Sequence, residues 1–357
     1  MKKLLWMGCL SYLLIGLAHV IMGSVLENLM LHYERAYSGG SQLIFNQFAG
    51  FLFGVLITPW VTSRLGRRGA LLLSLGCLTF AQAIYSLLPD WGWMLTVAPL
   101  AGFGFGMVEA VIGAVIIEFF GEQNAVAMSR LEMFFGMGAL LMPVIAGVLI
   151  VRNLWYVSFP FVGLVSLITL LLWAFLSFDG ADKLLAKRTA EEKRTEPPRT
   201  YARGSLPLLG LMALFFLLYV GMEMSLVNFM PSILIERMGA DQAMGTFGIT
   251  LFWITMSVGR LFAGTLAQKI GYTRYLTASC LGTLIGTGLF LLAGNLWSGY
   301  LIILALGLVM AGIFAIGLIL ANELLPGMTE RTTSILVASG GIGGAVLPRL
   351  MGWTMDA

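Results

Sequence analysis

The chain of 357 residues is strongly apolar and carries few charges. Hydrophobic residues make up 59% of it, charged residues 11%, and the mean hydropathy is +0.91, whereas a soluble globular chain has about 25% charged residues. These values exclude a soluble globular protein, and the net charge of +3 gives no sign of a nucleic-acid-binding surface. Three cysteines within apolar runs and only two histidines argue against a disulfide framework and a metal enzyme. We therefore expect an all-α integral membrane protein that uses no metal or cofactor.

Apolar segments long enough to cross a bilayer recur along the chain, since a spanning helix needs about 20 residues. We expect six spans before a charged segment and five after it. The expected spans are 4–30, 41–62, 69–88, 92–120, 129–151, 153–178, 206–235, 240–267, 274–294, 297–325 and 331–355. Residues 179–204 hold seven basic residues and a Pro-Pro pair, which predicts a solvated connector. It separates an N-terminal bundle, 1–178, from a C-terminal bundle, 205–357.

Lysine and arginine are distributed unevenly among the expected loops. With the N-terminus inside, 16 of them lie on the cytoplasmic side and three lie outside. This is the bias that the positive-inside rule describes. We therefore expect a multi-pass protein of the plasma membrane with a cytoplasmic N-terminus and a cytoplasmic connector.

The expected fourth span carries an acidic residue near its middle. Glu109 lies in GFGFGMVEAVIGAVIIEFF, residues 102–120, and Gly102, Gly106 and Gly113 share its helix face. A carboxylate among lipid tails costs roughly 2.5 to 3.5 kcal/mol, so Glu109 should face a cavity, a partner or a proton. The glycines allow close approach by a neighbouring helix or a ligand. A structural glutamate held between helices is the alternative to a proton-binding site, and we favour the proton-binding site.

An internal repeat relates the two halves of the chain. GMGALLMPVIAG, residues 136–147, matches GIGGAVLPRLMG, residues 341–352, at an offset of 205. The same offset pairs Gly54 with Gly259 and the turn PWVTSRLGRRG, from Pro59, with GTLAQKIGYTR. Two homologous six-helix halves are therefore predicted. Because the offset places a counterpart of the sixth span beyond residue 357, we expect the chain to be short by one helix.

These two turns resemble the loop motif of the major facilitator superfamily, G-x-L-A-D-R-x-G-R-R. The second copy, GTLAQKIG, is the better match, because Pro59 and Ser63 stand at the glycine and aspartate positions of the first copy. The resemblance implies two bundles with a gating turn in each. The residues assigned to the gating turns are Arg64, Gly66, Arg67, Arg68, Gly264, Lys269, Gly271 and the neighbouring Arg260.

A closer resemblance is to the branch of fucose permeases and glucose/mannose:proton symporters. The segments that carry it are GLAHVIMGS, FNQFAGFLFGVLI, MVEAVIGAVI, MSRLEMFFGMGALLMP, YVGMEMSLVNFMPSIL and LFWITMSVGRLFAG. In that branch a glutamate of the fourth helix takes part in proton coupling, which the resemblance implies for Glu109. A first-helix aspartate used by the fucose permease has no counterpart in the first span here.

Polar and aromatic residues within the spans are candidates for binding a polyol. Gln47, Glu223 and Asn228 offer hydrogen-bond donors and acceptors, and Trp253 is suited to stack on the apolar face of a sugar ring. His19 is a further candidate. A packed, hydrogen-bonded histidine and a plain core tryptophan remain as alternatives for His19 and Trp253.

Two functions fit these features. The first is a monomeric secondary active transporter that imports a hexose or related sugar together with protons by alternating access. The alternative is a proton-driven exporter of drugs, lipids or other amphiphilic molecules. Exporters of this superfamily often carry a Gly-Pro pair in the fifth helix, and GMGALLMP lacks it, which favours import. No nucleophile and base at a useful spacing indicate an enzyme.

Overall fold

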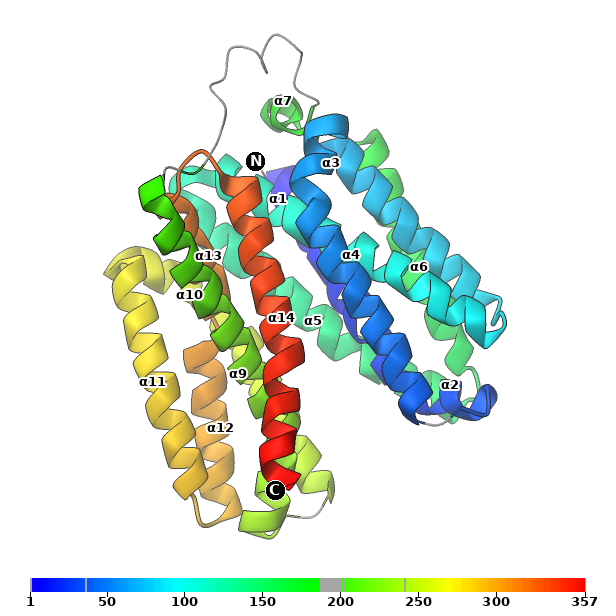
Figure 1. Cartoon of the computed structure of the whole chain (residues 1–357), viewed down its shortest axis with the longest axis vertical. Helices are drawn as coiled ribbons and strands as arrows, with labels where there is room; N and C mark the ends of the chain where they lie inside the picture. Colours follow the sequence, from blue (N-terminus) through cyan, green and yellow to red (C-terminus); the bar gives the residue numbers. More distant parts are fainter. Residues whose placement is uncertain (1, 36, 187–200, 202, 241, 357) are drawn as a thin grey trace. The chain divides into compact units, whose positions relative to one another are not determined.

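The computed structural model of the protein is built from helices (Figure 1). It describes residues 2–35, 37–186, 201, 203–240 and 242–356, and none of these residues forms a strand. The all-α prediction is therefore confirmed. Eight helical stretches of the described chain are long and apolar enough to span a membrane, so the expected count of 11 is not confirmed. Two of these stretches, Gln42–Ser86 and Trp91–Val151, are 45 and 61 residues long because neighbouring helices follow one another without a loop.

The chain divides into two compact units, each described by itself. The first unit comprises residues 1–120, 134–200 and 333–335, and the second comprises 121–133, 201–332 and 336–357. The helices of the first unit are α1 (Lys2–Ser24), α2 (Leu26–His32), α3 (Tyr37–Ser86), α4 (Trp91–Phe120), most of α5 (Asn124–Val151), α6 (Ser158–Phe175) and α7 (Asp182–Leu185). Those of the second unit are α9 (Leu206–Met238), α10 (Gln242–Ile270), α11 (Tyr272–Leu292), α12 (Leu296–Met310), α13 (Ile313–Leu324) and most of α14 (Thr329–Asp356). The start of α5, up to Met133, groups with the second unit.

Glycines bring α3 and α4 together in the first unit. A Cβ atom added to Gly50 would lie 2.0 Å from the Pro99 carbonyl oxygen, and one added to Gly102 would lie 1.8 Å from the Gln47 carbonyl oxygen. The two backbones are therefore in direct contact, as in other membrane helix pairs with small residues at the interface. This contact confirms the close approach predicted for the glycine face of α4.

The internal repeat reappears in the backbone of the two units. Gly66, at the kink inside α3, has φ 79°, and Gly271, 205 residues later between α10 and α11, has φ 90°. Helices α5 and α14 are both 28 residues long and begin 205 residues apart, at Asn124 and Thr329. The halves differ in their fourth spans. Helix α4 is continuous over 30 residues, whereas its counterpart is interrupted between α12 and α13.

The same glycines of the repeat pack on the first helix of each unit. A Cβ atom on Gly138 of α5 would lie 2.2 Å from the Leu13 carbonyl oxygen in α1. A Cβ atom on Gly343 of α14 would lie 1.9 Å from the Leu217 carbonyl oxygen in α9. Equivalent helix pairs are thus packed backbone to backbone in both units.

Candidate substrate and proton sites

Glu109 differs from its neighbours in α4 by being accessible. Every residue from Gly104 to Ile117 is buried except Glu109, which is half-buried. The Tyr12 hydroxyl of α1 donates a hydrogen bond to the Glu109 backbone carbonyl, 3.4 Å away. Glu109 is therefore less enclosed by the neighbouring helices than the rest of this segment. Its role in proton coupling stays a prediction.

Four phenylalanine rings surround His19 of α1. The centroid of its imidazole lies 5.1 Å from that of Phe48, 5.5 Å from Phe105, 5.8 Å from Phe135 and 6.4 Å from Phe51. Its Nδ1 atom is buried and finds no hydrogen-bond partner among the described residues. The Nδ1 atom of His19 thus lies among aromatic rings without a hydrogen-bond partner from the described residues.

Gln47 of α3 reaches the same level of α1. Its side-chain amide donates to the carbonyl of Ala18, the residue before His19, at 3.3 Å. Gln47 is 3% exposed, and its Oε1 atom has no hydrogen-bond partner in the described part of the chain. A buried polar atom without a partner costs about 1–3 kcal/mol. The two unpaired atoms lie at one level of α1, which makes this level a candidate place for hydrogen bonds to a ligand or a water molecule.

A buried polar cluster occupies the interior of the second unit. Its members are Glu132 at the start of α5, Tyr219 and Glu223 on α9, and Arg260 on α10, and each is at most 6% exposed. The Arg260 Nη1 atom donates to the Glu132 carbonyl oxygen at 3.0 Å, and Nη2 lies 3.6 Å from the Glu132 Oε2 atom. The Tyr219 hydroxyl donates a hydrogen bond to the Met310 carbonyl oxygen, 3.1 Å away.

The other predicted binding residues of the second unit lie outside this cluster. Asn228 is exposed on α9, and Trp253 is half-buried on α10 beside Phe252, with ring centroids 5.8 Å apart. Their contact with a substrate stays a prediction. Tyr219 was not among the predicted site residues, although its place four residues before Glu223 puts both on one helix face.

The first of the two turns that the sequence predicts to be gating turns is held by its arginines. Gly66 supplies the kink, Arg67 forms an ion pair with Glu118 of α4, and the exposed Arg64 guanidinium lies 5.4 Å from the centre of the Trp60 ring. Arg67 is 7% exposed. The ion pair therefore ties the turn to the end of α4.

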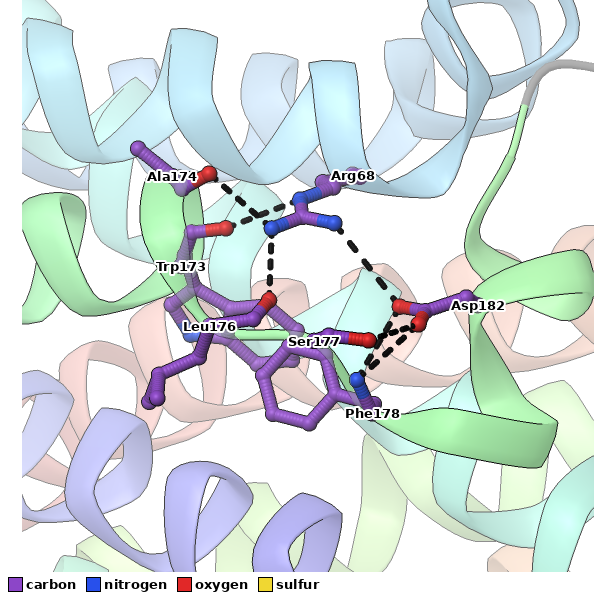
Figure 2. Close-up of polar contacts among 7 residues, drawn as sticks. All are labelled: Arg68, Trp173, Ala174, Leu176, Ser177, Phe178 and Asp182. Atoms are coloured by element: carbon purple, nitrogen blue, oxygen red, sulfur yellow. Dashed lines mark hydrogen bonds and ion pairs between the residues drawn. The ribbon is translucent and has the colours of Figure 1, made fainter.

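Arg68 binds the last carbonyls of α6 (Figure 2). Its Nε atom donates to Trp173 at 2.9 Å, and its Nη2 atom donates to Ala174 at 3.0 Å and to Leu176 at 2.6 Å. These carbonyls belong to the end of a helix, where intrahelical donors are missing and a positive charge is favourable. The Nη1 atom lies 3.7 Å from Asp182 at the start of α7.

Asp182 closes a short loop that leads away from α6. Its carboxylate accepts hydrogen bonds from the Ser177 hydroxyl and from the Phe178 backbone N–H. These two hydrogen bonds, in that order, and more weakly the Arg68 charge, lower the pKa of Asp182 below its ordinary value of 3.8. The carboxylate therefore stays ionised at neutral pH and holds α7 beside the first turn.

The second predicted gating turn is packed through a glycine contact. A Cβ atom on Gly264 would lie 2.4 Å from the carbonyl oxygen of Ala125 at the start of α5. Gly271 has the positive φ of the turn, and Lys269 is exposed. The Gln268 side chain donates to the Glu122 carbonyl oxygen. In the second unit the turn is thus held against the start of α5.

Comparisons with known proteins agree with this architecture. The model of the Major Facilitator Superfamily matches residues 4–355. The glucose/mannose transporter GlcP of Bacillus subtilis (strain 168) is 29% identical over 358 residues, which cover 98% of this chain and 87% of that protein. The crystal structure of FucP, a transporter of this superfamily in the outward conformation, is similar with a TM-score of 0.82 at 14% identity, over 99% of this chain and 92% of that one.

The proton:xylose symporter XylE has a TM-score of 0.79 at 14% identity, over 99% of this chain and 89% of that one. At this identity the two solved structures show a shared fold. The resemblance to sugar symporters that the sequence suggested is confirmed by these matches. Because the family match spans nearly the whole chain, the protein belongs to the Major Facilitator Superfamily and is a multi-pass membrane transporter.

Proposed function

We propose that the protein imports a hexose or a related sugar together with protons. The observation that carries the proposal is the similarity, along 98% of the chain, to a transporter of glucose and mannose. The structural similarity to the fucose:proton symporter FucP, with a TM-score of 0.77, and to the proton:xylose symporter XylE supports coupling to protons. The bias of basic residues supports a cytoplasmic N-terminus in the plasma membrane.

Gln47 and His19 are the proposed sugar contacts of the first unit. The Gln47 Oε1 atom and the His19 Nδ1 atom are buried and unpaired among the described residues, and sugar hydroxyls are hydrogen-bond donors that suit such acceptors. The phenylalanine rings around His19 offer apolar surface to the C–H groups of a sugar. Trp253, half-buried on α10, is the proposed stacking residue of the second unit.

Glu109 is the proposed proton carrier. It is the accessible residue within the buried stretch Gly104–Ile117 of α4. An ionisable group at this depth must exchange its proton with water or be neutralised, because an isolated charge inside a bilayer is costly. Alternation between protonated and ionised Glu109 would link the proton gradient to sugar accumulation.

Uptake into proteoliposomes tests both parts of the proposal. Labelled glucose, mannose, fucose and xylose are offered with and without an imposed pH gradient. We expect at least one hexose to accumulate in the wild-type vesicles only when the outside is acidic. Glu109→Gln should keep sugar counterflow, which moves no net proton, and should lose accumulation. Glu122→Gln is the matched control, since among the described residues Glu122 is bound only through its backbone carbonyl, by Gln268.

The outcomes separate the alternatives. Full accumulation by Glu109→Gln would remove Glu109 from the coupling mechanism while leaving sugar transport intact. Absence of uptake for every sugar, together with extrusion of amphiphilic dyes driven by the pH gradient, would replace import by export.

A further inference from the structure

Helices α3 and α6 of the first unit are joined through polar side chains. The Thr79 and Ser166 hydroxyl groups form a hydrogen bond to each other, with their oxygens 2.8 Å apart. The Ser166 hydroxyl also approaches the Leu75 carbonyl oxygen, to which it donates at 3.4 Å. Hydrogen bonds between helices contribute to helix association in a bilayer, where lipid tails offer no partners. The interface of α3 and α6 is therefore polar at this level.

Near the end of α3 and the beginning of α6, three buried side-chain oxygens lack a hydrogen-bond partner among the described residues. They are the Gln82 Oε1 atom, the Tyr85 hydroxyl oxygen and the Ser158 hydroxyl oxygen. Gln82 is 1% exposed, and Tyr85 and Ser158 are fully buried. Buried polar groups of native proteins are nearly always hydrogen-bonded, either to the protein or to ordered water. Unpaired atoms in this number therefore indicate a small polar ligand.

Gln82 and Tyr85 lie one helical turn apart, and both face α6. A Cβ atom built on Gly163 of α6 would lie 3.2 Å from the Gln82 Cβ atom, and the ring centroids of Tyr85 and Phe159 are 5.4 Å apart. Residues i and i+3 are neighbours on a helix surface, and a long helical side chain points back toward the preceding turn. We therefore expect the Tyr85 hydroxyl to extend toward the turn that carries Gln82.

Gly163 leaves room beside the Gln82 side chain. Apart from the adjoining residues of α6, only Gln82 among the described residues has atoms within 4 Å of the Cβ position of Gly163. At Gly50 of α3, in contrast, three backbone atoms of Pro99 lie within 2.5 Å of the equivalent position. The missing side chain of Gly163 thus does not serve backbone contact, as that of Gly50 does. It leaves space next to a buried amide group.

We propose that a water molecule is bound between α3 and α6 and bridges the side chains of Gln82 and Tyr85. The water donates a hydrogen bond to the Gln82 Oε1 atom and accepts one from the Tyr85 hydroxyl, so that both unpaired atoms are satisfied at once. A buried water makes about three hydrogen bonds, and the Ser158 hydroxyl is the candidate for the third. The inference goes beyond the proposed function, since none of these residues is a proposed sugar contact.

The competing arrangement is a dry interface in which the two side-chain oxygens stay unpaired. Removal of an unpaired buried polar group is neutral or stabilising, whereas removal of one partner of a hydrogen bond leaves the other partner unsatisfied and destabilises the fold. The wet and the dry interface therefore predict opposite effects of the same substitution.

X-ray footprinting of the full chain in lipid nanodiscs, without sugar, tests for the water directly. Radiolysis of water produces hydroxyl radicals, which oxidise a fully buried aromatic ring only where a water molecule lies next to it. We expect Tyr85 to be oxidised, whereas Phe216, which is equally buried and contacts Phe314, should stay unmodified. In Gln82→Leu the oxidation of Tyr85 should fall to the level of Phe216. Absence of Tyr85 oxidation from the wild type, or equal oxidation in Gln82→Leu, overturns the proposal.

Thermal unfolding gives an independent result. Tyr85→Phe should lower the midpoint in the wild-type background, because the water loses a partner. It should leave the midpoint unchanged or raise it in the Gln82→Leu background, where the water is already lost, and a double-mutant cycle measures this coupling. Tyr156→Phe, which removes an exposed hydroxyl, is the matched control and should leave the midpoint unchanged.

The direction of the Tyr85→Phe effect decides between the two interfaces. A midpoint that Tyr85→Phe leaves unchanged or raises in the wild-type background means a dry interface and overturns the proposal. If Gln82→Leu does not fold, the oxidation of Tyr85 in the wild type and the effect of Tyr85→Phe decide without it. Because no sugar is present, a failure of sugar uptake changes neither measurement.

Discussion

Gln47 and Gln82 are two buried glutamines on either side of the Gly66 kink of α3, with different surroundings. They are 3% and 1% exposed, and the Oε1 atom of each lacks a hydrogen-bond partner among the described residues. Gln47 lies beside His19 and its phenylalanine rings, whereas Gln82 lies under Gly163 of α6, where an added Cβ atom would be 3.2 Å from the Gln82 Cβ atom. Substituting each of these glutamines therefore separates the effect of losing a buried amide from the effect of losing it beside His19.

Gln47→Leu should weaken sugar binding about tenfold or more. A sugar hydroxyl that loses its acceptor while it stays buried costs about 1–3 kcal/mol. Gln82→Leu removes an equally buried amide beyond the Gly66 kink and should leave the affinity unchanged. Binding isotherms of the purified variants measure both. Equal affinity of Gln47→Leu and the wild type would assign Gln47 to the scaffold.

The site residues differ in how readily the sequence alone identifies them. Glu109, Gln47, His19 and Glu223 stand out because polar residues are rare in apolar spans. Arg68 was placed in a gating turn, but its bonds to the end of α6 were not predicted, because backbone carbonyls have no sequence signature. Arg260 and Glu132 interact although they are 128 positions apart in the sequence. A contact between residues so far apart leaves no local sequence pattern.

Arg68 and Asp182 join three elements, the first turn, the end of α6 and α7. Arg68→Lys should loosen the end of α6 and the loop that leads to α7, because an ammonium group lacks the planar fork that reaches three carbonyls. Trypsin should then cut faster after the exposed Lys183 of α7. Asp182→Asn should have a smaller effect, since the Arg68–Asp182 pair is 30% and 35% exposed and such pairs contribute about 0–1 kcal/mol. Arg64→Lys is the control for a neighbouring arginine.

The pH dependence of this contact follows from the lowered pKa of Asp182. A group whose folded pKa is depressed stabilises the fold above its unfolded pKa, and loses that contribution as the pH falls through the folded pKa. Protection of Lys183 should therefore be equal at alkaline and mildly acidic pH, and hydrogen exchange of α7 should increase only below about pH 4. An earlier loss, near neutral pH, would point to a different titrating group.

Helix positions were predicted more closely than helix connections. The spans expected at 92–120 and 274–294 correspond to α4, Trp91–Phe120, and α11, Tyr272–Leu292, because apolar length alone defines them. The breaks at Val25 and between α12 and α13 were not predicted. Neither contains proline, and both depend on packing around the helix end. The spans expected at 92–120 and 129–151 are joined in one helical stretch, Trp91–Val151, through a short 3₁₀ turn at Gly121–Gln123.

Substitution of Gly66 and Gly271 tests whether the turns of the two halves contribute equally to stability. Their φ values of 79° and 90° are ones that residues with a Cβ atom rarely adopt, at a cost of about 1–3 kcal/mol. Gly66→Ala and Gly271→Ala should therefore lower the midpoint of thermal unfolding by similar amounts. Gly147→Ala, in α5 with open space around the added Cβ, should leave it unchanged or raise it.

Thermal unfolding of the three alanine variants in one detergent gives a direct comparison. A loss confined to Gly66→Ala would mean that the second turn tolerates another backbone conformation. The two turns would then share a backbone conformation but would contribute differently to stability.

The ion pair between Glu132 and Arg260 also has a consequence for how the chain is made. The two residues are 128 positions apart, so the ribosome delivers Glu132 to the membrane long before α10 has been synthesised. Until then the carboxylate must stay protonated or remain at the membrane surface. Insertion of α10 supplies the arginine and completes the burial of both groups. The start of α5 is therefore among the last parts of the first six helices to settle, and a chain that stalls before Arg260 presents an unfinished acidic helix end to the quality-control machinery of the cell.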